Sequence, residues 1–154
     1  MQPAQPKIQV SIPDQELRLL DGNRVVATYP VSTSKFGVGT EPGSYKTPAG
    51  RFRVAERHGD GAPEGTIFKS RQPVGLWNPG EPVDSDLVLT RILWLEGLEE
   101  ANANTKDRFI YIHGTNQEGL IGQPASIGCV RMRNADVAEL YEQVPEGAEV
   151  EILA

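Results

Sequence analysis

The chain has 154 residues, of which 38% are hydrophobic and 23% are charged, and its formal net charge at pH 7 is -6. This length suits a single domain with one hydrophobic core, and the composition is that of a globular protein. The negative charge disfavours nucleic acid or an anionic membrane surface as a partner, because both would repel the chain.

The N-terminal third of the chain has the pattern of a β-meander. Apolar residues alternate with polar ones between Ile8 and Leu19, as in strands that bury one face. The pair Asp21-Gly22 favours a tight turn into a further strand over Arg24–Ser32. Later strands are predicted at Gly50–Arg57, Thr66–Ser70, Leu87–Leu95, Arg108–His113 and Ala148–Leu153.

A single helix is predicted between Asn134, which can cap it, and Pro145, which stops it. Most of the 16 glycines and 12 prolines lie in long loops, a feature that compact domains usually keep for function. These loops are Ser34–Ala49, His58–Gly65, Gln72–Pro82 and Gly114–Gly128. The sequence therefore predicts one mainly β domain over residues 1–154, with its core between about residues 7 and 153 and a single short helix.

Cys129 is the only cysteine, so no internal disulfide can form and the thiol needs another explanation. It lies in a turn-prone segment shortly before the predicted helix, and His113 ends a strongly apolar strand. A strand-end histidine and a loop cysteine are the two parts of an activated thiolate nucleophile. A lone cysteine is more often a small buried hydrophobic residue, so the surrounding pattern decides between these interpretations.

Two segments carry that pattern. His113-Gly114-Thr115-Asn116 and Ser126-Ile127-Gly128-Cys129-Val130-Arg131-Met132 resemble the His…Ser-x-Gly-Cys-x-Arg signature of the L,D-transpeptidase (YkuD-like) family. Upstream, Tyr29–Thr33 and Lys46–Phe52 are similar to the family's strand and its Thr-Pro-x-Gly-x-Phe turn. The resemblance extends from about Val10 to Leu153.

The resemblance implies an L,D-transpeptidase-type β-sandwich with long loops and a short helix after the cysteine. It assigns Cys129 as the nucleophile, His113 as its base, and the main-chain carbonyl of Gly114 as the group that orients the histidine. It also implies that Arg131 holds a substrate carboxylate, a task that suits a guanidinium; the alternative is a surface ion pair. Ile127 departs from the motif, because many members carry histidine there.

Two further residues of the motif are candidates for substrate binding. We expect Ser126 to hold the turn through a hydrogen bond from its side chain to the backbone. Gly128 is expected to allow a backbone conformation, or a close approach, that turns the Cys129 amide toward a developing oxyanion.

Other residues with functional side chains have simpler interpretations. His58 is interpreted as a solvated loop residue, because no other histidine and no cysteine stands near it at metal-binding spacing. No metal or cofactor is predicted. Tyr45 and Trp77, both in Gly/Pro-rich loops, are expected either to line the substrate groove or to anchor their loops, and Trp94 reads as core.

The family resemblance implies peptidoglycan stem peptides or muropeptides as substrates. The cysteine would attack the L,D-peptide bond between diaminopimelate and D-alanine and form a thioester. Resolution by water is L,D-carboxypeptidase activity, whereas resolution by an amine gives a 3-3 cross-link. A carbapenem is expected to act as a covalent inhibitor.

The chain enters its first strand near residue 7 without a basic segment or a long apolar run. This start favours a cytoplasmic enzyme that trims soluble muropeptides. An exported L,D-transpeptidase whose signal peptide has been removed, acting in the periplasm or cell wall, is the alternative. A catalytically inactive wall-binding module is a further one, whereas a papain-type protease is disfavoured because here the histidine precedes the cysteine.

Overall fold

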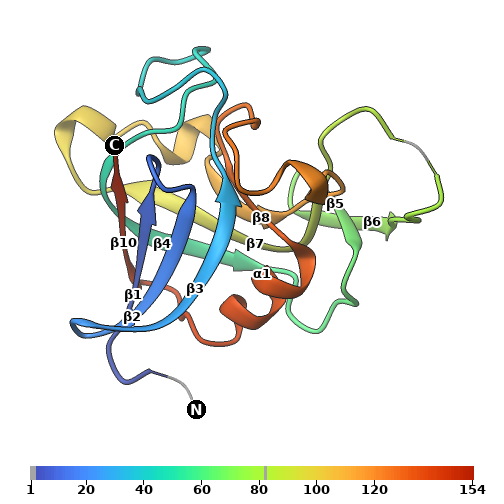
Figure 1. Ribbon diagram of the computed structural model, residues 1–154, viewed down its shortest axis with the longest axis horizontal. Coiled ribbons are helices and arrows are strands. Elements are labelled where there is room, and N and C mark those ends of the chain that lie inside the picture. The colour runs from blue at the N-terminus through green and yellow to red at the C-terminus, as the bar shows by residue number, and fades with distance from the viewer. Residues whose placement is uncertain (1–2, 82) are drawn as a thin grey trace.

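The computed structural model describes residues 3–81 and 83–154. Within that part of the chain, ten strands form one sheet (Figure 1). The strands are β1 (Pro6–Ser11), β2 (Glu16–Asp21), β3 (Arg24–Ser32), β4 (Gly50–His58), β5 (Thr66–Lys69), β6 (Gln72–Leu76), β7 (Val88–Gly97), β8 (Tyr111–Gly114), β9 (Val130–Met132) and β10 (Glu149–Leu153). The α-helix α1 covers Asn134–Tyr141, and short 3-10 helices cover Glu100–Asn102, Lys106–Arg108 and Glu118–Leu120.

The strands follow the order β4-β10-β1-β2-β3-β9-β8-β7-β5-β6, and β4 also pairs with β7. That extra pairing closes the sheet on itself, so strands from both ends of the chain share one interior. The β5–β6 hairpin extends beyond β7, on the side of the molecule away from both chain ends (Figure 1). The prediction of a mainly β fold is confirmed.

The core lies where the sequence pattern predicts it. The apolar residues that alternate along β1 and β2, among them Ile8 and Leu19, have no exposed surface. Val137 and Leu140 on one face of α1 join the same buried cluster. The spacing of apolar residues, every second in strands and every third or fourth in the helix, therefore places the main core.

The predicted strand Arg108–His113 begins three residues too early. Lys106–Arg108 form a 3-10 helix, and Phe109 has a φ of 57°, which is not a strand conformation. The strand β8 starts only at Tyr111. The apolar side chain of Phe109 suggested a strand, but that residue is 53% exposed.

Asn134 does not cap α1 as predicted, because the capping position is Arg133 and Asn134 is the first helical residue. Its side chain is buried and accepts a hydrogen bond from the Thr90 hydroxyl at 2.7 Å. Thr90 lies in an irregularity of β7 with a φ of 74°, a rare conformation for a β-branched residue. The asparagine therefore ties the helix start to a strained point of the sheet beside β8.

Two strands were not predicted: β6 lies in the segment expected to be the loop Gln72–Pro82, and β9 lies between the predicted loop that ends at Gly128 and the predicted helix. Every residue of β6 is exposed, so the hairpin strand lacks the alternation that marks a half-buried strand. The strand β9 has only three residues, which is too short for a periodic signal. It nevertheless follows Cys129 directly and fixes where that residue stands.

Candidate active site

The parallel pairing of β8, which carries His113, with β9, which begins directly after Cys129, brings the two motif segments together. Ile112 lies opposite Val130, and His113 lies opposite Arg131. Ile112 and Val130 face the core, so His113 and Arg131 face the other side, because alternate residues of a strand share a face. Cys129, just before β9, packs against Tyr111, which shares this face of β8 with His113.

The orientation of His113 is set by its own main chain. The imidazole is 1% exposed, and its Nδ1 hydrogen-bonds the carbonyl oxygen of Gly114. A carbonyl can only accept, so Nδ1 carries the proton and Nε2 keeps a lone pair. Position 114 has to be glycine, because a Cβ there would collide with the Asn134 side chain and the Leu89 carbonyl.

The thiol of Cys129 is half-buried and held by backbone groups. Its Sγ donates to the Phe109 carbonyl at 3.4 Å and accepts from the Tyr111 N–H at 3.4 Å. Burial raises the pKa of the thiol to about 11. Burial likewise lowers the pKa of His113 from its ordinary value, against the opposing effect of the Asp86 carboxylate. The resting pair is therefore a neutral thiol and a neutral imidazole rather than an ion pair.

A neutral resting pair makes a testable prediction about pH. Only the thiolate reacts rapidly with iodoacetamide, so the alkylation rate should be low between pH 6 and 8. It should then rise roughly tenfold per pH unit toward the thiol pKa. Mass spectrometry reads the reaction at Cys129 alone, because the chain has one cysteine. A rate that is already at its plateau near pH 7 would show that a thiolate–imidazolium pair is the resting state.

The turn before Cys129 is held by two hydroxyl groups. Ser126 donates to the Cys129 carbonyl at 2.7 Å, and its Oγ accepts from the Gly128 N–H at 3.3 Å. Thr47 donates to the Gly128 carbonyl at 2.9 Å. Gly128 has a φ of 132°, and a Cβ there would meet only ordinary contacts. Glycine is therefore required by the backbone angle and not by crowding.

Arg131 was expected either to hold a substrate carboxylate or to form a surface ion pair, but the structure buries it. Its side chain has no exposed surface. Nη1 donates to the Gln117 side chain at 2.6 Å and pairs with the Asp86 carboxylate at 3.2 Å, while Nη2 donates to the Ser32 hydroxyl at 3.2 Å. Both terminal nitrogens of the guanidinium are thus paired inside the protein, and this geometry argues against direct contact of the guanidinium with a substrate carboxylate.

Three cavities show which surfaces are open. One of about 220 Å³ lies beside the cysteine turn; Tyr45, Arg108, Ile110 and Ile127 are among its lining residues. Ile127 is 54% exposed, so the residue that departs from the family motif faces this cavity. Trp77 instead lines a separate cavity of about 280 Å³ near the start of α1.

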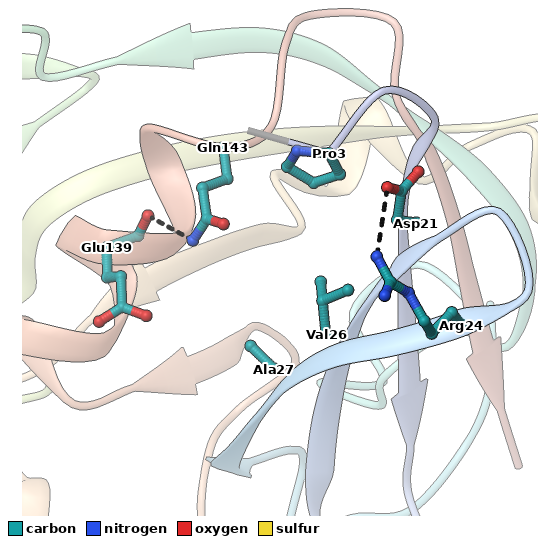
Figure 2. A pocket seen from close by; sticks show the side chains of 7 residues that line it. All are labelled: Pro3, Asp21, Arg24, Val26, Ala27, Glu139 and Gln143. Carbon is teal, nitrogen blue, oxygen red and sulfur yellow. Dashed lines mark hydrogen bonds and ion pairs between the residues drawn. The ribbon is translucent and has the colours of Figure 1, made fainter. Parts of the chain in front are cut away.

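The third cavity, of about 240 Å³, lies between α1 and the β2–β3 hairpin. Figure 2 shows Glu139 and Gln143 facing Arg24 and Val26 across it. None of its lining residues belongs to β8 or β9, so it takes no part in the Cys129–His113 site.

The second histidine of the chain differs from its predicted place. His58 is the last residue of β4 rather than a loop residue, and its Nε2 lies 3.0 Å from the Glu56 carboxylate. No group of three or more His, Cys, Asp or Glu side chains arranged to hold a metal is found in residues 3–81 and 83–154. Over the same residues, no helix is long and apolar enough to cross a membrane.

Sequence reasoning missed Asp86, whose carboxylate accepts from Thr115 at 2.8 Å and pairs with Arg131. Nothing in the local sequence marks this residue, because its partners are far from it along the chain. Thr47 was recognised only as part of a motif, and the structure shows its contact with the cysteine turn.

Sequence comparison identifies a protein family and relatives that are similar to this chain. A family model for the L,D-transpeptidase catalytic domain (YkuD) matches residues 5–152. YkuD of Bacillus licheniformis is 32% identical over 146 residues, which are 95% of this chain and 64% of that protein. The chain therefore spans slightly less than two thirds of the length of this relative.

Solved structures show the same fold. An L,D-transpeptidase from Xylanimonas cellulosilytica matches 97% of this chain and 61% of its own, with a TM-score of 0.63 and 20% identity. The L,D-transpeptidase LdtMt1 in complex with imipenem matches 96% of this chain and 58% of its own, with a TM-score of 0.60 and 18% identity. The sequence match and the shared fold agree: the chain belongs to the YkuD family of L,D-transpeptidase catalytic domains.

Proposed function

We propose that the chain is a cysteine acyltransferase that acts on the L,D-peptide bond of peptidoglycan stem peptides. The observation that supports this most is that β9, which begins directly after Cys129, pairs in parallel with β8, the strand that carries His113. The hydrogen bond from His113 to the Gly114 carbonyl leaves Nε2 free to accept a proton. Membership of the L,D-transpeptidase family supports the proposed substrate class.

In the proposed first step, His113 Nε2 takes the thiol proton while Sγ attacks the carbonyl carbon at the L-centre of diaminopimelate. The Cys129 thiol must first leave the Phe109 carbonyl to which it donates. The tetrahedral intermediate then breaks its C–N bond, and the protonated His113 gives its proton to the departing D-alanine amine. The product is a thioester between Cys129 and the shortened stem.

The cysteine turn supports this step by holding the backbone in one conformation. Thr47 fixes the carbonyl of the Gly128–Cys129 peptide, and Ser126 fixes the carbonyl of the following Cys129–Val130 peptide. We propose that the Cys129 N–H of this rigid turn donates to the oxyanion. A donor held in place before the reaction stabilises the developing charge without reorganisation.

Either of two acceptors completes the proposed reaction. An amine from another stem gives a 3-3 cross-link, and water gives a tripeptide, which is L,D-carboxypeptidase activity. Both routes share the first step. Only the identity of the product distinguishes the carboxypeptidase route from cross-linking.

Incubation with a purified tetrapeptide muropeptide tests the proposal. We expect release of one D-alanine per tetrapeptide consumed, with tripeptide, dimer or both as the second product, separated by chromatography and identified by mass. The ratio of tripeptide to dimer at millimolar substrate reports water against amine. An intact tetrapeptide after prolonged incubation would reject the proposed function.

A carbapenem is proposed as a covalent inhibitor. Its strained β-lactam carbonyl offers the thiol the same kind of acyl group as the stem peptide, and ring opening leaves a thioester. A structural neighbour, LdtMt1, has been solved in complex with imipenem. The expected adduct on this chain is one drug molecule on Cys129.

A further inference from the structure

Arg71 lies over an aromatic platform beside Cys129. The platform consists of Trp94, Phe109 and Tyr111: the Trp94 and Phe109 rings stack with centroids 5.8 Å apart, and the Tyr111 ring meets Trp94 edge-on at 5.7 Å. The Arg71 guanidinium carbon is 4.5 Å from the Trp94 centroid and 5.7 Å from that of Phe109. Its Nη1 donates to the Tyr111 hydroxyl at 3.0 Å. These contacts hold the cation in one place.

The backbone places Arg71 there in an unusual conformation. Lys69 pairs with Gln72, so Ser70 and Arg71 form a two-residue turn between β5 and β6. Their φ angles are 47° and 65°, the left-handed region that hairpin turns of this kind usually fill with Asn-Gly. The second position of this turn, where glycine is usual, carries Arg71, and its side chain lies over the platform.

The platform also holds the thiol. Phe109 accepts from Sγ through its carbonyl, and Tyr111 donates to Sγ through its N–H. The Cys129 side chain packs against the cluster that contains Trp94 and Tyr111. The guanidinium therefore stands over the same two residues whose main chain positions the nucleophile.

Two other cations near the site form ion pairs. Lys106, which also lies over Trp94, pairs with the Glu56 carboxylate at 2.9 Å, and Arg131 pairs with Asp86. Across residues 3–81 and 83–154, no ion pair joins Arg71 to a carboxylate. A half-buried cation held over this platform without an ion pair is suited to bind an anionic group of the substrate.

We propose that Arg71 binds the carboxylate of the terminal D-alanine and so selects stems that end in a free carboxylate. The inference rests on the proposed function. In that substrate the scissile carbonyl carbon is bonded to the D-alanine nitrogen, and this nitrogen is bonded to the Cα that carries the carboxylate. Arg71 thereby takes the role that the sequence motif implied for Arg131, whose guanidinium is buried and already paired.

Binding to the Cys129→Ala protein tests the proposal without turnover. The ligands are a tetrapeptide muropeptide and the same molecule with a C-terminal D-alaninamide, compared by calorimetry. With Arg71 present, the amide should bind about tenfold or more weakly, the effect of losing a hydrogen bond to a charged group. Adding Arg71→Gln should make the two affinities equal, and Arg71→Lys should restore part of the difference.

Lys106→Gln is the matched control, because it removes another cation from the Trp94 face whose charge is already paired. It should keep the full preference for the free acid. If Arg71→Gln merely shifted the hairpin, both ligands would bind more weakly and the ratio of their affinities would stay unchanged. That result would overturn the proposal. No measurable binding of the free acid to the Arg71 protein at millimolar concentration would overturn it too.

The failure of the proposed function gives a different pattern. A wild-type protein that releases no D-alanine, but whose Cys129→Ala form prefers the free acid through Arg71, rejects the acyl transfer and retains the carboxylate site. Normal D-alanine release combined with an unchanged ratio in Arg71→Gln rejects the site and retains the function.

Discussion

Cys129→Ala is expected to abolish D-alanine release from tetrapeptide muropeptide, because alanine has no group that can form the thioester. The loss should be complete within detection, since a base and substrate binding alone do not replace a covalent intermediate. The measurement is D-alanine per enzyme over time. Release by Cys129→Ala at the wild-type rate would show that Cys129 is not the nucleophile.

Two controls separate loss of chemistry from loss of structure. The side chain is small and half-buried, so we expect the melting temperature to change by no more than about 2–4 °C, the effect of roughly 1 kcal/mol in a domain of this size. Imipenem should add one drug mass to the wild type and none to Cys129→Ala. An adduct that persists in Cys129→Ala would place the reactive group elsewhere.

His113→Gln is expected to lower kcat/KM by about 10²–10⁴-fold, the range for removing a positioned general base. Glutamine fills much of the buried space, which limits the cavity left by a smaller residue. Because burial lowers the pKa of His113 below its ordinary value of 6.5, the wild-type imidazole remains a neutral base as pH falls from 8 to 6.5. Activity should be lost only at lower pH, as Nε2 becomes protonated.

His58→Gln is the matched control, since the chain has two histidines and His58 bonds to Glu56 on β4. It should retain wild-type activity and the same acidic limb. If His113→Gln keeps kcat/KM within threefold of wild type, His113 is not the base. If the acidic limb of the pH profile moved in His58→Gln, the limb would not report the protonation of His113.

The local sequence determined the elements that depend on short-range patterns. Alternation of apolar residues predicted β1 and β2, because a half-buried strand has a period of two, and the pair Asp21-Gly22 predicted the turn from β2 into β3. Helical spacing predicted α1, and Pro145 follows its end. The residue types around Cys129 and His113 identified the chemistry, because a thiol needs a base whatever the fold.

Only the tertiary structure decided how those groups meet. Cys129 and His113 are separated by 16 positions, and the pairing of β8 with the three-residue strand β9, which begins directly after Cys129, brings their segments together. The sequence motif suggested an arginine for the substrate at position 131, but Asp86 and Gln117 bury that guanidinium. A left-handed turn brings Arg71 over Trp94 instead. Strand register, burial and charge compensation arise from contacts between distant segments, so a local pattern of residues does not contain them.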